Sequence, residues 1–155
     1  MKKIFTKVLI IGLVMVLGSE LRAQSNWEVG ARFGNSFSAD ITIPLSAAPR
    51  LHTALNFDNN FSFGTYFDWM FDLQGGPNGL KFYPGVGPEF YFGNSFNVAA
   101  AGDFGAEYSF DFPLTIGFDW RPHFMLSNGM KFSSNNWGFM ARFRFGEGVK
   151  FTRSN

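Results

Sequence analysis

The chain has 155 residues, of which 46% are hydrophobic and 22 are phenylalanine, and its formal net charge is +1. This length corresponds to a single domain, and the near-neutral charge excludes a strongly basic nucleic-acid-binding surface. The sequence contains no cysteine, so neither disulfide bonds nor a lipid anchor on a cysteine can form.

Residues 1–23 predict a cleaved secretory signal peptide. Three lysines precede an apolar run at 8–17, and the region ends in the small residue Ala23. The run is too short to span a membrane as a helix. Removing this segment leaves one domain, residues 24–155, with 9 basic and 11 acidic side chains. We therefore expect an exported protein that has no nucleic-acid partner.

The remaining sequence alternates between apolar and polar residues. In 137–145 the odd positions are large and apolar, and the even ones are Gly, Met and Arg, which is typical of a β-strand with two different faces. Clusters rich in Gly, Asn, Asp and Pro separate the segments, which favours an antiparallel meander. The same alternation defines eight segments: 27–33, 37–43, 50–57, 61–72, 80–92, 96–110, 114–125 and 137–145.

Phenylalanine is confined to one of these two faces. Of the 22 phenylalanines, 18 fall within the segments, and all of these lie on the apolar face. The other four, Phe5, Phe112, Phe132 and Phe151, fall outside the segments. A soluble periplasmic barrel of lipocalin type would turn this face inward around an apolar ligand, whereas an outer-membrane barrel would turn it towards lipid. An eight-stranded barrel has an interior just wide enough for side chains, and 18 phenylalanines would overfill it.

The opposite face is small and charge-balanced, which also favours the membrane alternative. It is rich in Gly and Ala, as a narrow lumen requires, and it carries acidic and basic side chains in similar numbers. We therefore predict an all-β fold, an eight-stranded antiparallel up-and-down transmembrane β-barrel. Its apolar residues point outward and its polar residues fill the lumen.

Because an unpaired buried charge is costly, these side chains should pair and plug the lumen. The predicted polar network consists of Glu28, Arg32, Asp40, Arg50, His52, Asp68, Lys81, Glu89, Asp103, Glu107, Asp119, Arg121, His123, Arg142 and Arg144. Tyr66, Tyr83 and Tyr91 lie on the same polar face, where their hydroxyl groups can find partners. All four tryptophans lie on the apolar face, where they are candidates for interfacial girdles.

Several motifs resemble the small outer-membrane barrels of the OmpA and OmpX type, and in particular the short barrel proteins common in Bacteroidetes-like bacteria. The resemblance rests on the signal peptide, on the eight strands, on 105–110 followed by 113–122, and on the last strand, which ends Arg142-Phe143-Arg144-Phe145. It implies a bacterial outer-membrane location, contact with outer-membrane lipid, and insertion by the barrel-assembly machinery. We expect a monomer without a cofactor. Such barrels often end on the last aromatic residue, whereas here 146–155 follow.

Motifs for catalysis are weak. The fragment Gly85-Val86-Gly87 is better explained by small lumen residues than by a phosphate-binding loop, and no histidines have metal-site spacing. His123 and Ser127 slightly resemble the pair of the lipid A deacylases, which leaves a lipid A-modifying enzyme as an alternative. The two residues would, however, lie about 13 Å apart along an extended strand. We therefore predict no catalytic, cofactor-binding or metal-binding residues, and a structural or interaction role.

Loops and prolines complete the expectations. If both termini face the periplasm, only the connection 127–136 gives the outer surface enough length to bind a partner. The candidate interaction residues there are Asn128, Met130, Lys131 and Phe132. Pro84, Pro88 and Pro122 lie within predicted strands, where proline interrupts hydrogen bonding, so we expect bulges or strand ends and a break near 85–87.

Overall fold

The structure, a computed structural model, describes residues 27–57, 60–127 and 129–146. The predicted signal peptide, 1–23, and the tail after Gly146 lie outside these described residues. No helix among the described residues is long and apolar enough to cross a membrane. The strands are β1 (Trp27–Gly34), β2 (Ser38–Pro44), β3 (Pro49–Asn56), β4 (Phe61–Trp69), β5 (Phe71–Asp72), β6 (Leu80–Phe92), β7 (Phe96–Ser109), β8 (Leu114–Trp120), β9 (His123–Met125), β10 (Lys131–Ser133) and β11 (Trp137–Phe145).

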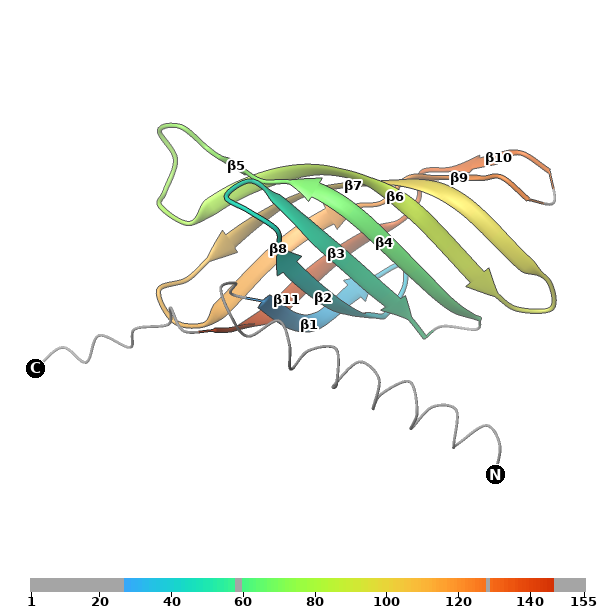
Figure 1. Cartoon of the computed structure of the whole chain (residues 1–155), viewed down its shortest axis with the longest axis horizontal. Helices are drawn as coiled ribbons and strands as arrows, with labels where there is room; N and C mark the ends of the chain where they lie inside the picture. Colours follow the sequence, from blue (N-terminus) through green and yellow to red (C-terminus); the bar gives the residue numbers. More distant parts are fainter. Residues whose placement is uncertain (1–26, 58–59, 128, 147–155) are drawn as a thin grey trace, which may run out of the picture.

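These strands form one closed antiparallel barrel whose wall consists of eight strands, two of which are interrupted (Figure 1). β5 continues β4, and β9 continues β8, because each pair keeps a single register against its neighbour. β1 closes the ring by pairing with β11 along its whole length, from Trp27 opposite Phe145 to Gly34 opposite Gly138. The predicted fold class is confirmed, and closure leaves each wall strand a partner on both sides.

The two ends of the barrel differ in their connections. One end carries the start of β1, the end of β11 and the connections 45–48, 73–79 and 110–113. The other end carries the turns 35–37 and 93–95, the end of β3 with the start of β4, and the hairpin of β9 and β10 (Figure 1). The sequence predicted only a loop over 127–136. Part of it is strand β10, because Phe132 lies opposite Phe124 and extends the alternating pattern.

Pro84 and Pro88 do not break the strand that contains them. β6 pairs with β7 without a gap over its whole length, so the break expected near 85–87 is wrong. The interruptions fall on the other side, where β4 and β6 keep one register but the positions opposite both prolines are unpaired. Proline has no amide hydrogen, so it lies where the ladder needs no donor.

Pro122 separates β8 from β9, as expected for a strand end. Its carbonyl oxygen still accepts a hydrogen bond from the amide of Gly102, at 2.8 Å. On its other side, the pairing of β9 with β10 is offset by one residue from the pairing of β8 with β11. Pro122 therefore marks the point where the hairpin leaves the regular barrel wall.

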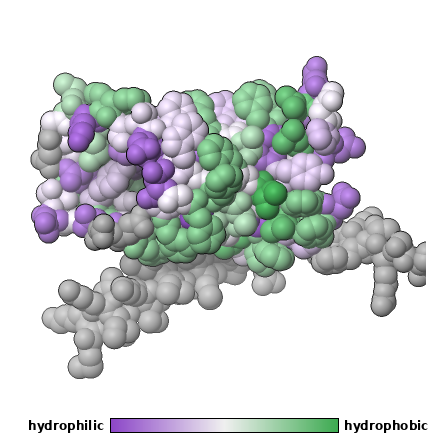
Figure 2. Space-filling model, turned by 180° about the vertical axis from the view of Figure 1, so that it is seen from behind, coloured by the Kyte–Doolittle hydropathy of each residue, from purple (hydrophilic) through white to green (hydrophobic). Residues whose placement is uncertain are grey.

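The apolar face of the strands points outward. Each of the 18 alternating phenylalanines is partly or fully exposed, whereas Arg32 and Arg142 on the opposite face are 0% exposed. In Figure 2, hydrophobic residues predominate in the middle of the visible face, and the most hydrophilic residues lie mostly towards its two ends. A soluble barrel with its phenylalanines inside is therefore not the arrangement of this chain.

Gly30 tests how tightly the closing seam between β1 and β11 is packed. A Cβ atom at this position would lie 1.9 Å from the backbone oxygen of Ala141, and backbone cannot move aside cheaply. We expect Gly30→Ala to lower the free energy of unfolding by about 2 kcal/mol, as overpacking does. Urea titration of the detergent-folded protein, followed by tryptophan fluorescence, measures this loss.

Ala31→Val, one residue further on the outward face, is the matched control and should change stability little. If both variants are as stable as the wild-type protein, the close packing of the seam is refuted.

Candidate functional site

The lumen is the place where this chain gathers its chemistry. Alternate residues of every wall strand point inward, and small ones such as Ala54, Ala99 and Gly85 leave volume for long polar side chains. A Cβ atom at Gly85 would lie 2.0 Å from Asp68 Oδ1, so glycine makes room there for a carboxylate. Gly85 and Gly87 are thus lumen residues, as the sequence favoured.

Within the part of the chain that the structure describes, eleven charged residues form one connected cluster, which we call the lumen network. Each is at most 7% exposed and forms at least one ion pair with another member. The members are Glu28, Arg32, Asp40, Arg50, His52, Asp68, Asp103, Glu107, Asp119, Arg121 and Arg142.

One part of the network joins the first strand of the barrel to the last. Arg142 on β11 donates from Nε to Glu28 on β1, at 2.8 Å, and from Nη2 to Glu107 on β7. Arg50 on β3 donates to the same Glu107 oxygen at 2.7 Å, and to Asp68 at 2.9 Å. Two guanidinium groups therefore share one carboxylate, which fixes three walls of the barrel relative to one another.

Arg121 is the centre of the other part. Its Nη2 lies 3.0 Å from Asp40 Oδ2 and 2.8 Å from Asp119 Oδ2, and its Nε lies 3.3 Å from Asp103 Oδ1. Arg32 Nε contacts the other oxygen of Asp119 at 2.6 Å. A planar guanidinium with several fixed N–H groups can serve three carboxylates at once, which a lysine ammonium cannot do with the same geometry.

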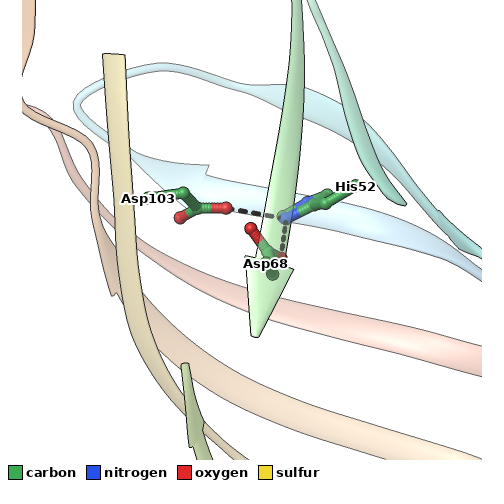
Figure 3. Close-up of side chains that lie close together, drawn as sticks. All are labelled: His52, Asp68 and Asp103. Atoms are coloured by element: carbon green, nitrogen blue, oxygen red, sulfur yellow. Dashed lines mark ion pairs between the residues drawn. The ribbon is translucent and has the colours of Figure 1, made fainter. Parts of the chain in front are cut away.

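His52 connects the two parts and is surrounded by carboxylates. Its Nε2 lies 3.1 Å from Asp40 Oδ2, and its Nδ1 lies 2.7 Å from Asp103 Oδ2 and 3.3 Å from Asp68 Oδ2. Figure 3 shows His52, Asp68 and Asp103 converging from β3, β4 and β7. All three are 0% exposed, so the charges have no water to solvate them.

A smaller cluster lies nearer the end that carries the β9–β10 hairpin. Glu89 accepts hydrogen bonds from the hydroxyl groups of Tyr66, at 2.5 Å, and of Tyr91. His123 Nδ1 is 3.8 Å from Glu89, beyond hydrogen-bond distance, and its ring packs against Tyr91. A shallow pocket borders this cluster at Tyr91. It is lined by Asn60, Tyr91, Gly93, Asn94, Ser95, Asn97 and Met125.

Three of the residues predicted for the polar network lie at its margins instead. Lys81 is half-exposed and pairs only loosely, at 3.7 Å, with Asp72, whose side chain is 82% exposed. Arg144 donates to the backbone oxygens of Phe110 and Phe112 rather than to a carboxylate. These residues, like the partly exposed His123, lie close to strand ends, where water competes with ion pairs.

The candidate residues of the 127–136 connection do not join the lumen network either. Met130 and Phe132 are 80% and 61% exposed on the hairpin beside the exposed Lys131, and Asn128 lies outside the described residues. The Ser127 hydroxyl donates to Asn97 and accepts from the amide of Val98, so its partners are not those of His123. This geometry gives no support to a Ser–His pair.

Sequence reasoning missed several neutral partners of the network. Thr115 and Thr42 donate to Glu28 at 2.9 and 3.4 Å, and Ser38 donates to Asp40 at 2.8 Å. Met140 is buried, and its sulfur accepts a hydrogen bond from Arg142 Nη1 at 2.6 Å. All four have the inward parity of their strands, so that parity was the signal that would have found them.

Comparison with known proteins supports the architecture. No protein-family model matches the chain, and no curated protein matches it in sequence. A solved structure, the N-terminal β-barrel domain of OprF from Pseudomonas aeruginosa, is similar with a TM-score of 0.58 and 15% sequence identity. The match covers 79% of this chain and 100% of that domain. At this identity the likeness shows the fold alone. It supports the predicted β-barrel fold.

Arg142 should be among the side chains whose removal costs most. Arg142→Met leaves Glu28 without a guanidinium partner and takes one of two from Glu107 in a buried space. Breaking a buried ion pair in this way should lower the free energy of unfolding by about 3–5 kcal/mol. Urea titration in detergent micelles, with heat-modifiable gel mobility as the test of folding, measures the effect.

Arg144→Met removes the same group two residues further, at the margin, and should cost about 1 kcal/mol. Equal losses in the two variants would contradict the buried network as a source of stability.

Proposed function

We propose that the protein is an integral β-barrel of a bacterial outer membrane, inserted after export with a cleaved signal peptide. The observation that carries the proposal is the inverted distribution of side chains, with phenylalanine outside and eleven charged residues inside a closed barrel. Such a surface is poorly soluble in water, whereas lipid accepts it and the closed wall satisfies the backbone.

The tryptophans support a membrane-spanning orientation. Trp27 and Trp69 lie at the end where β1 begins and β11 ends, while Trp120 and Trp137 stack at the opposite end, with ring centroids 5.4 Å apart. The nine residues of β11 between these girdles extend about 27 Å along the strand. With the usual tilt, this gives a height of about 20 Å, close to the apolar band of outer-membrane barrels.

The lumen network supports a plugged interior and a structural or interaction role without catalysis. Its side chains are buried and paired with one another, and among the described residues Ser127 and His123 do not contact each other as a nucleophile and its base would. We extend the proposal to a monomer that contacts outer-membrane lipid, is inserted by the barrel-assembly machinery, and belongs with the short barrels of Bacteroidetes-like bacteria. The exposed Met130 and Phe132 on the outer hairpin are the preferred contact point for a partner.

Cell fractionation tests the location. We expect the full chain to sediment with the outer membrane, to resist carbonate and urea washes, and to need detergent for extraction, because lipid covers the phenylalanine face. A soluble periplasmic protein from the same cells serves as the control. Recovery of the protein in the aqueous periplasm without detergent would refute a membrane barrel.

Planar bilayer recordings test the plugged lumen. Because the network fills the barrel with paired side chains, we expect the reconstituted wild-type protein to give no large, stable conductance steps. Bilayers treated with detergent alone provide the baseline. Large and stable steps that depend on the protein would contradict a closed interior while leaving the membrane location intact.

A further inference from the structure

We propose that His52, Asp68 and Asp103 form a binding site for one divalent first-row transition-metal ion inside the lumen. The three side chains come from β3, β4 and β7, and each can direct one donor atom towards the same point (Figure 3). His52 supplies a ring nitrogen and the two aspartates supply carboxylate oxygens, a mixed set that suits zinc and its neighbours.

The donor atoms have the separations of a coordination shell. His52 Nδ1 lies 3.3 Å from Asp68 Oδ2 and 2.7 Å from Asp103 Oδ2. Ligands bound tetrahedrally to zinc lie about 3.3 Å apart. The distance between His52 and Asp68 already has this value, and the Asp103 carboxylate would have to move away from His52 by a fraction of an ångström. One ligand atom from each of the three side chains lies within 4.8 Å of the other two.

Unpaired polar atoms provide the second, independent observation. Among the described residues, His52 Nδ1, Asp68 Oδ1 and Asp103 Oδ2 are buried atoms without a hydrogen bond of acceptable geometry. His52 Nδ1 and Asp103 Oδ2 lie only 2.7 Å apart, yet neither atom forms a hydrogen bond of acceptable geometry. Buried polar atoms left in this way are rare, and an ion bound between His52 Nδ1 and Asp103 Oδ2 would satisfy both of them.

The surroundings of His52 match those of a metal-binding histidine. Its other nitrogen, Nε2, lies 3.1 Å from Asp40 Oδ2 and 3.2 Å from Arg121 Nη2. In the tautomer that donates from Nε2 to Asp40, Nδ1 is free to bind metal. Arg50 and Arg121 in turn hold Asp68 and Asp103, with Nε atoms 2.9 and 3.3 Å from them. The ligands are thus oriented by an outer layer of contacts.

Charge balance favours a divalent cation over a proton. The lumen network contains six carboxylates and four guanidinium groups, as its ion pairs show. A proton on His52 Nδ1 would leave one negative charge uncompensated in a dry interior, whereas a divalent ion beside neutral His52 makes the network neutral. One divalent ion is therefore enough to balance the charge of the network. The guanidinium groups beside the aspartates weaken the attraction between the carboxylates and this ion.

Metal loading of the full chain tests this site. The protein is unfolded in denaturant, refolded into detergent with excess Zn²⁺, and desalted. The zinc content per chain is then measured by elemental mass spectrometry. We expect about one zinc ion per chain in the wild-type protein. In His52→Gln and Asp103→Asn, which remove one ligand each while keeping size, we expect the zinc affinity to fall at least about tenfold.

His123→Gln is the matched control, because it changes the other histidine of the chain and should keep full zinc content. Refolding with Co²⁺ should also give the visible absorption of a tetrahedral site, and Asp103→Asn should abolish it. Heat-modifiable gel mobility selects the variants that fold. Two results would overturn the proposal. One is a wild-type protein that folds in excess Zn²⁺ but holds no zinc after desalting, and the other is a folded His52→Gln that binds zinc as the wild type does.

Discussion

Charges that point into a closed barrel must find their partners inside it, and this requirement organises the rest of the structure. Arginine meets it better than lysine, because one guanidinium reaches several carboxylates in fixed directions. Arg121 contacts three aspartates, while Lys81 lies at a strand end beside exposed Asp72. Glycine and alanine on the same face leave the space that these long side chains need.

The same division assigns the aromatic residues. Phenylalanine has no polar atom to satisfy, so it can occupy the outer face, whereas a buried tyrosine hydroxyl needs a partner. Tyr66 and Tyr91 find theirs in Glu89, and the ring of Tyr83 lies 4.3 Å from the guanidinium carbon of Arg50. Side-chain chemistry therefore selects the face of the wall, and the backbone pattern only provides the two choices.

Period-2 alternation was sufficient to predict the barrel, the outward face and all eleven charged members of the lumen network, because parity decides which face a residue occupies. It could not predict contacts across the lumen. His52, Asp68 and Asp103 lie on three strands, and their convergence depends on register and on the curvature of the wall. The hairpin at Phe132 and the unbroken strand at Pro84 were also missed, since both depend on which neighbour each strand has at that point.

The ion pair between Glu28 and Arg142 joins residues 114 positions apart, and the pair between Arg32 and Asp119 spans 87. Neither pair can form in a sheet that lacks its last strand, which would leave carboxylates without cations on the face about to become the interior. Partly assembled barrels are therefore penalised electrostatically as well as by their open edges. The chain should acquire its stability late and in one cooperative step, with a high contact order and a slow folding rate.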